Sequence, residues 1–189
     1  AYSDILKSLG AGGYRDEGLA MAKVIDYGDD HFTCFQFHYD WRLDNAQNGK
    51  LLYEFIQEKK AYIEKEYLTR YRINKEVKFD IVAHSMGGLL TRYMLRFGNE
   101  LLPEDGTIPA ITWKGAELVD KVVLVGTPNA GSANGFIKAV KGLDVPFFDD
   151  FPSALLSTLP SIYQLMPRER HKAIVYKKAP RKAIHDFLS

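Results

Sequence analysis

One short segment sets the strongest limit on how this chain folds. The run from Val77 to Ala83 is mostly apolar, which is typical of a parallel strand covered on both faces. A turn with two glycines, Ser85 to Gly88, follows directly, and apolar residues then recur at helical spacing from about Leu89 to Phe97. A strand that passes into a helix within two or three residues crowds its backbone, so small residues are needed there. The segment therefore predicts a strand, turn and helix within an α/β fold.

The residues of this turn match the pattern of a nucleophile elbow. In Ala83-His84-Ser85-Met86-Gly87, small residues stand two positions before and two after the serine, with Ala in place of the commoner first Gly. Such a turn lifts the serine hydroxyl above the sheet edge. It also aims the backbone N–H of Met86, reinforced by the helix N-terminus, at the position where an oxyanion forms. We therefore predict Ser85 as a nucleophile and Met86 as an oxyanion donor, with a purely structural turn as the alternative.

The sequence does not single out the group that would activate Ser85. His84 is adjacent, but an elbow directs neighbouring side chains apart, so His84 is poorly placed to take the serine proton. A triad in the chain order Ser, acid, His leaves five formal candidates, namely Asp144, Asp149, Asp150, His171 and His185. None of them follows a convincing sheet strand, and 173–176 is only a brief strand candidate. We prefer surface or cap roles for these residues.

The remaining apolar runs alternate between strand-like and helix-like periods, which indicates α/β layering. The aromatic and β-branched residues from Phe32 to Trp41 predict a strand, and Val122 to Val125 predicts another buried strand. From Asn48 to Arg72, apolar residues at helical spacing predict an amphipathic helix that covers one sheet face, with its charges in solvent. We place a partial core in residues 1–132 and a cap or lid in residues 133–189. Prolines break the second region into short pieces, and the alternative to a cap is an ordinary long connecting segment.

Composition excludes several classes of protein and of site. The 189 residues are 46% hydrophobic and 26% charged, enough for a sizeable core. A formal charge of +1, from 25 basic and 24 acidic residues, gives no global field that would recruit nucleic acid. Cys34 is the only cysteine, which excludes an internal disulfide and a cysteine-built metal site.

Targeting and membrane signals are also missing from the sequence. No apolar run approaches the roughly 18 to 20 residues of a membrane span, and the first residues do not resemble a signal peptide. The compartment therefore stays open. The last 22 residues hold seven Lys or Arg against two acids. We interpret this excess of basic residues as a solvated surface, with contact to a membrane surface or lipid headgroups as the alternative.

Four further segments resemble the lecithin:cholesterol acyltransferase family, in the family's own order. Tyr39-Asp40-Trp41-Arg42-Leu43 matches its Tyr-Asp-Trp-Arg signature, which is more specific than the elbow. The other three are Tyr2, Leu6 and Leu9 followed by Gly13-Tyr14-Arg15-Asp16, the turn Gly126-Thr127-Pro128-Asn129-Ala130-Gly131-Ser132, and the cap-like Ser161-Ile162-Tyr163-Gln164-Leu165-Met166-Pro167. The resemblance covers nearly the whole chain.

The resemblance implies a mostly parallel α/β-hydrolase sheet flanked by helices, with a Pro-rich cap. It implies acyl transfer through an acyl-Ser85 intermediate, from a lipid or other acyl ester to water or a lipid alcohol, without a metal or organic cofactor. It also places the second oxyanion donor before Ala1 and the triad Asp and His after Ser189, so that the chain is a fragment of a larger enzyme.

Six residues are candidates for the substrate pocket, namely Asp40, Trp41, Arg42, His84, Thr127 and Asn129. The first three follow the strand before the elbow, at the carboxyl edge where sites form. The alternatives are a buried Asp40–Arg42 pair that braces the loop and a structural turn at 127–129. A catalytically inactive module that binds lipid or a partner is the second functional hypothesis. The oligomeric state stays open.

Overall fold

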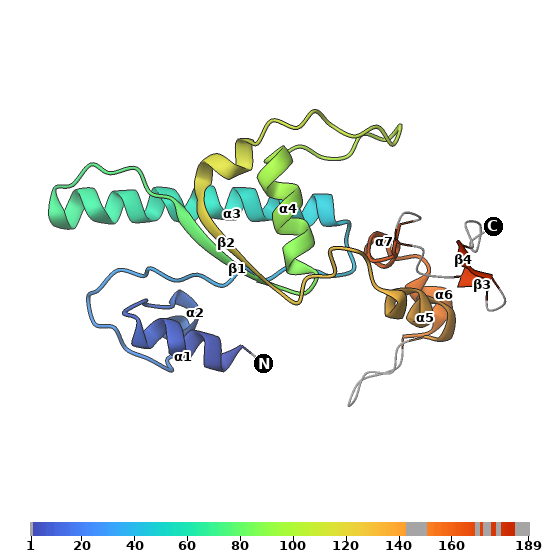
Figure 1. Cartoon of the computed structure of the whole chain (residues 1–189). Helices are drawn as coiled ribbons and strands as arrows, with labels where there is room; N and C mark the ends of the chain where they lie inside the picture. The colour runs from blue at the N-terminus through green and yellow to red at the C-terminus, as the bar shows by residue number, and fades with distance from the viewer. Residues whose placement is uncertain (1, 143–150, 169–170, 172–174, 177–178, 184–189) are drawn as a thin grey trace.

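The computed structural model describes residues 2–142, 151–168, 171, 175–176 and 179–183. These residues form a mixed α/β structure around a small parallel sheet (Figure 1). In chain order the elements are α1 (Ser3–Ala11), α2 (Glu17–Met21), α3 (Asn45–Glu66), a π-helical turn (Tyr67–Tyr71), β1 (Phe79–His84), α4 (Gly87–Phe97), a 3-10 helix (Lys114–Leu118), β2 (Val119–Val125), α5 (Ala133–Lys141), α6 (Ser153–Leu156), α7 (Pro160–Gln164), β3 (Val175–Tyr176) and β4 (Ala179–Ala183).

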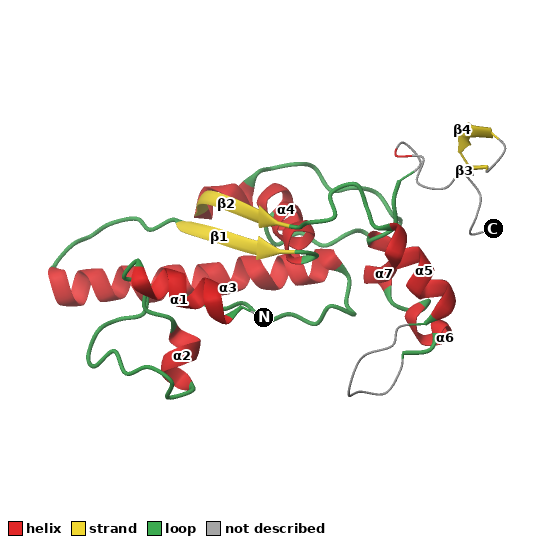
Figure 2. Ribbon diagram, turned by 60° about the horizontal axis from the view of Figure 1, so that its bottom comes forward, coloured by secondary structure: helices red, strands yellow, loops and turns green. Residues whose placement is uncertain are grey.

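The sheet consists of β1 and β2, which run parallel in a register that places Ile81 beside Val122 and Ala83 beside Leu124. Figure 2 shows the two strands side by side and running roughly along the length of α3, with α4 near their carboxyl ends. The predicted strands at Val77–Ala83 and Val122–Val125 are thereby confirmed, as are the helix after the elbow and the long amphipathic helix. Only the second half of the strand candidate 173–176 is described, as β3, which pairs with β4 in a separate antiparallel hairpin.

The hydrophobic core lies between α3, α4 and the 3-10 helix, on one face of the sheet. Its buried members are Leu52, Tyr53, Ile56, Leu90, Met94 and Leu118, and the β1 side chains Phe79 and Ile81 pack against them. Two glycines allow this close approach. A Cβ on Gly49 would lie 2.9 Å from Tyr93 Cδ1, and one on Gly115 would lie 1.9 Å from the carbonyl oxygen of Met94.

The opposite face of the sheet is exposed, which corrects the expectation that both faces are covered. Side chains of a strand alternate between faces, so Val82 lies beside Val123 on the face that turns away from α3. Val123 is 54% exposed, and Val82 and Val125 are also exposed. Both strands therefore carry more apolar side chains than the described residues cover.

The prediction of a strand from Phe32 to Trp41 is wrong. The segment makes a single isolated parallel bridge, between Asp16 and Cys34. Its aromatic side chains pack instead, since the ring of Phe35 lies 6.2 Å from that of Phe79 and the ring of Phe37 stacks 6.2 Å from that of Tyr39. Aromatic residues favour strands because they fit half-buried surfaces, and here that burial occurs without a ladder partner among the described residues. Among all the residues that the structure describes, no helix is long and apolar enough to cross a bilayer.

Replacing Gly115 by Ala tests the close packing of the core. The new Cβ would meet the backbone of Met94, which cannot rotate away, so we expect the free energy of unfolding to fall by about 1–3 kcal/mol. Chemical denaturation measures this change. Gly10→Ala in α1 is the matched control, because a Cβ there meets nothing within 4 Å, and it should leave stability unchanged or slightly raised. Equal losses in both variants would contradict the packing argument.

Candidate active site

Ser85 lies at the junction of β1 and α4, where the strand passes into the helix. Its φ of 52° lies in the left-handed region, which costs a residue with a side chain about 1–3 kcal/mol. Two backbone hydrogen bonds hold this conformation. Ser85 N–H donates to the carbonyl of Val125 at 2.9 Å, and its own carbonyl accepts from Gly88 N–H at 3.1 Å. The backbone at Ser85 is therefore fixed in an unfavourable conformation by the neighbouring strand and helix.

Of the two glycines after Ser85, Gly88 is the one that the packing requires. A Cβ on Gly88 would lie 2.0 Å from Thr127 Oγ1 and 2.9 Å from Thr127 Cβ. A Cβ on Gly87 would meet only the ring of Tyr39, at 3.7 Å from its hydroxyl oxygen. The turn after β2 thus packs directly on the first turn of α4.

Met86 occupies the N-cap position of α4, and its side chain is buried. Its carbonyl accepts hydrogen bonds from Leu89 N–H at 2.9 Å and Leu90 N–H at 3.4 Å. In the described part of the chain, no group accepts a hydrogen bond from Met86 N–H. A free N–H at a helix N-terminus is the kind of group that stabilises a developing oxyanion.

Thr127 and Asn129 follow β2 at the same carboxyl edge of the sheet and form a tight turn. Asn129 N–H donates to the carbonyl of Thr127 at 2.8 Å, and its side-chain oxygen accepts from Arg92 of α4 at 2.6 Å. The hydroxyl oxygen of Thr127 is buried and has no hydrogen-bond partner among the described residues. Asn129 therefore ties the turn to α4, while Thr127 brings an unsatisfied polar atom to this edge.

Asp40 and Arg42 form an ion pair within one loop. Arg42 Nη2 donates to Asp40 Oδ2 at 2.6 Å, and Arg42 Nε donates to Asp40 Oδ1 at 2.8 Å. These hydrogen bonds lower the pKa of Asp40 to about 2. The expectation of a buried pair is wrong, because 57% of the Arg42 side chain is exposed. The loop is held instead through the carbonyl of Asp40, which accepts from the buried amide of Asn48 at 2.8 Å.

Side chains of α7 and of the segment before it reach this edge of the structure. Gln164 donates to Asp44 Oδ2 at 2.9 Å and accepts from Asn45 N–H at 2.8 Å, so it joins α7 to the N-terminus of α3. The ring of Trp41 meets that of Phe151 edge-on at 5.9 Å. The sequence places Gln164 in a cap-like segment but does not reveal its partners, because no local pattern links residues about 120 positions apart.

His84 lies on the exposed face of the sheet, where its Nδ1 is 3.1 Å from the hydroxyl of Tyr2. Within the described ranges, Ser85 has no hydrogen bond with a histidine or carboxylate. His171 is described, with its N–H donating to Arg168 at 2.9 Å, whereas Asp144, Asp149, Asp150 and His185 lie outside the described residues. The same ranges hold no group of three His, Cys, Asp or Glu side chains arranged to bind a metal.

Replacing Gly88 by Ala tests the contact between the elbow and the turn after β2. We expect the free energy of unfolding to fall by about 1–3 kcal/mol, because the Cβ would overlap both Oγ1 and Cβ of Thr127. Thermal and urea unfolding measure the loss. Gly87→Ala is the matched control and should change stability by under about 0.5 kcal/mol, since its nearest neighbour is 3.7 Å away. A larger loss for Gly87→Ala than for Gly88→Ala would reverse this assignment.

Comparison with known proteins places the chain in a family. Searches of curated proteins and of solved structures found no match. The family model of lecithin:cholesterol acyltransferase matches residues 2–188, which is nearly the entire chain. Members of that family are acyltransferases and hydrolases that act on lipids. The chain therefore belongs to the lecithin:cholesterol acyltransferase family.

Proposed function

We propose that this chain carries the nucleophile of a serine-dependent acyl-transfer enzyme, and that Ser85 takes an acyl group from a lipid ester. The observation that carries the proposal is the left-handed backbone of Ser85 between β1 and α4. Strain of this kind is retained where the surrounding structure enforces it, and it is frequent at active sites. The family supports the lipid substrate at the level of a class.

In the proposed reaction, Ser85 Oγ attacks the ester carbonyl carbon while a general base takes its proton. The carbonyl oxygen becomes an oxyanion, which accepts a hydrogen bond from Met86 N–H. Collapse of this intermediate breaks the ester bond, and the leaving alcohol takes the proton from the base. Water or a lipid alcohol then attacks acyl-Ser85, which releases a fatty acid or a new ester and restores the serine. Because no described histidine contacts Ser85, we place the base outside the described residues.

We further propose that β1 and β2 belong to an α/β-hydrolase-type sheet in a core of residues 1–132, and that residues 133–189 form a cap. Support comes from the parallel pairing of the strands and from the strand, turn and helix around Ser85. The contacts of Gln164 with Asp44 and of Trp41 with Phe151 join the second region to the loops near the carboxyl edge.

The six pocket candidates divide by chemistry in this proposal. Trp41 offers an apolar ring next to Phe151, which suits an acyl chain, whereas the unpaired hydroxyl of Thr127 is buried against the first turn of α4 and would help to shape the site. Asp40, Arg42, Asn129 and His84 are already engaged in hydrogen bonds, so we assign them to shaping the loops around the pocket.

A binding module without catalysis is the second candidate function. The lack of any histidine or carboxylate bonded to Ser85 within the described ranges favours it. In that case the family fold would hold a lipid or a partner, and the strained serine would have no chemical role.

Labelling with a fluorophosphonate probe separates the two functions. The probe reacts with activated serines, so we expect labelling of the full-length gene product that falls to background in Ser85→Ala. Ser132→Ala is the matched control, because it removes a hydroxyl from the turn after β2, and it should keep labelling. If the folded full-length protein stays unlabelled, the catalytic proposal fails and the binding module takes its place.

A further inference from the structure

A polar cleft lies at the end of α3 that is remote from Ser85. Its volume is about 390 Å³, and it is lined by the Gly12–Gly13 turn and by Tyr14, Arg15, His31, Thr33, Tyr67 and Tyr71. With 22 residues at 1.5 Å each, α3 is roughly 33 Å long. Figure 1 shows its C-terminal end far from the carboxyl ends of β1 and β2. The cleft is therefore a separate feature from the candidate active site.

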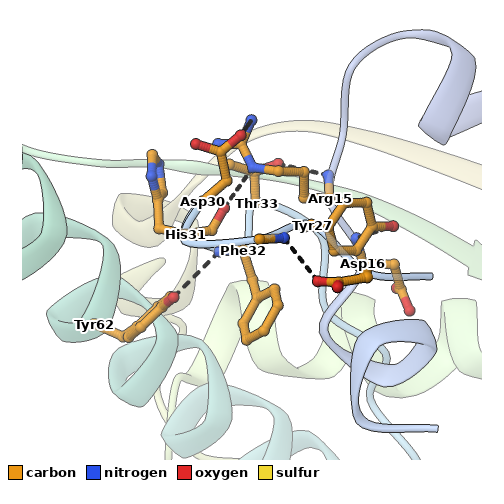
Figure 3. Close-up of polar contacts among 10 residues, drawn as sticks. Arg15, Asp16, Tyr27, Asp30, His31, Phe32, Thr33 and Tyr62 are labelled. Atoms are coloured by element: carbon orange, nitrogen blue, oxygen red, sulfur yellow. Dashed lines mark hydrogen bonds and ion pairs between the residues drawn. The ribbon is translucent and has the colours of Figure 1, made fainter. Parts of the chain in front are cut away.

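Arg15 is held in this cleft by hydrogen bonds that do not use the end of its guanidinium, which makes one long ion pair. Its Nε donates to the carbonyl of His31 at 2.6 Å, and its backbone N–H donates to Thr33 Oγ1 at 2.9 Å (Figure 3). The side chain is only 24% exposed. The nearest carboxylate is that of Asp30, whose Oδ2 lies 3.9 Å from Nη1 and which is mostly solvated. Among the described residues, no acceptor lies within hydrogen-bond distance of Nη1 or Nη2.

His31 supplies a second polar group that lacks a partner. The residue is 5% exposed, and its ring meets those of Tyr67 and Tyr71 edge-on at 5.7 and 5.9 Å. Its Nδ1 is buried without a hydrogen-bond partner among the described residues. Burial, with the charge of Arg15, lowers the pKa of His31, so the ring is neutral near pH 7 and carries one N–H donor. Because Nδ1 is shielded from the cleft, the N–H of His31 that a ligand there could meet is the one on Nε2.

The charge of the cleft favours an anion. Of the described residues that line it, Arg15 alone carries a formal charge. Outside the lining, Arg70 and Glu66 are paired with each other and cancel, and the mostly solvated carboxylate of Asp30, 3.9 Å from Arg15 Nη1, offsets part of the Arg15 charge. Tyrosine hydroxyls and an imidazole N–H add neutral donors, and no carboxylate is among the lining residues described.

We propose that this cleft binds the phosphate group of a phosphate ester. The free end of the Arg15 guanidinium would take two phosphate oxygens, which is the geometry that arginine favours, and His31 and the hydroxyl of Tyr71 would donate to the same group. The volume leaves room for the ester substituent beside the tyrosine rings. A lipid headgroup and a soluble phosphate ester share this chemistry. The proposal does not depend on catalysis at Ser85.

Titration with inorganic phosphate, followed through the imidazole NMR signals of His31, tests the site. We expect phosphate to shift these signals, and chloride at equal ionic strength to leave them in place. Arg15→Gln should weaken phosphate binding about tenfold or more, since it removes charge-assisted hydrogen bonds. Lys65→Gln is the matched control, because it removes the same charge from an exposed position of α3 outside the cleft. The phosphate affinity of this variant should equal that of the parent chain.

Vesicles distinguish the two sources of the phosphate group. If phosphatidylcholine vesicles bind the chain only when they contain phosphatidic acid, and Arg15→Gln but not Lys65→Gln abolishes this, the ligand is a lipid headgroup. Phosphate binding without vesicle binding indicates a soluble ester. Absence of any shift of the His31 signals, or equal phosphate affinity in a folded Arg15→Gln variant, overturns the proposal. If Arg15→Gln does not fold, the Tyr71→Phe variant tests the site in its place, because it removes the hydroxyl and keeps the ring. An unchanged phosphate affinity in Tyr71→Phe also overturns the proposal.

Discussion

The burial of α4 against α3 and the 3-10 helix fixes the helix that begins directly after Ser85. Leu90 and Met94 are almost completely buried, and glycines at positions 49 and 115 let the backbones approach closely. Since α4 begins immediately after Ser85, its fixed position determines where the strained turn lies. A well-packed core resists small displacements, so strain at the turn can be maintained by contacts made several residues away.

The carboxyl edge of the sheet gathers groups from distant parts of the sequence. Ser85 follows β1, and Thr127 follows the parallel neighbour β2, so both lie where ligands bind in α/β proteins. Arg92 joins the turn after β2 to α4, and Gln164 joins α7 to the N-terminus of α3. The polar contacts at this edge therefore hold loops together, while Met86 N–H and the Thr127 hydroxyl remain unengaged among the described residues.

The two ends of α3 have different chemical characters. Near its N-terminus lie the Asp40–Arg42 loop, which follows Tyr39 beside Gly87 of the elbow, and the contacts of Gln164. At its C-terminus, Tyr67 and Tyr71 of the π-helical turn flank His31 beside Arg15. One long helix thus lies between the proposed acyl-transfer site and the proposed phosphate cleft. The exposed apolar face of β1 and β2 belongs to neither.

The sequence alone determined the strand, turn and helix around Ser85, the long helix α3 and the family. These depend on periodicity and on small residues within a few positions, which local patterns reveal. Only the tertiary structure decided that 32–41 packs through its rings with one isolated bridge in place of a strand, that the Asp40–Arg42 pair is exposed, and that Gly88 rather than Gly87 meets Thr127. It also decided that Arg15, His31 and Tyr71 share one cleft. The packing of Gly88 and the cleft depend on contacts between residues far apart in the chain, and the exposure of the local Asp40–Arg42 pair depends on what the rest of the chain packs around it, which composition and spacing do not encode.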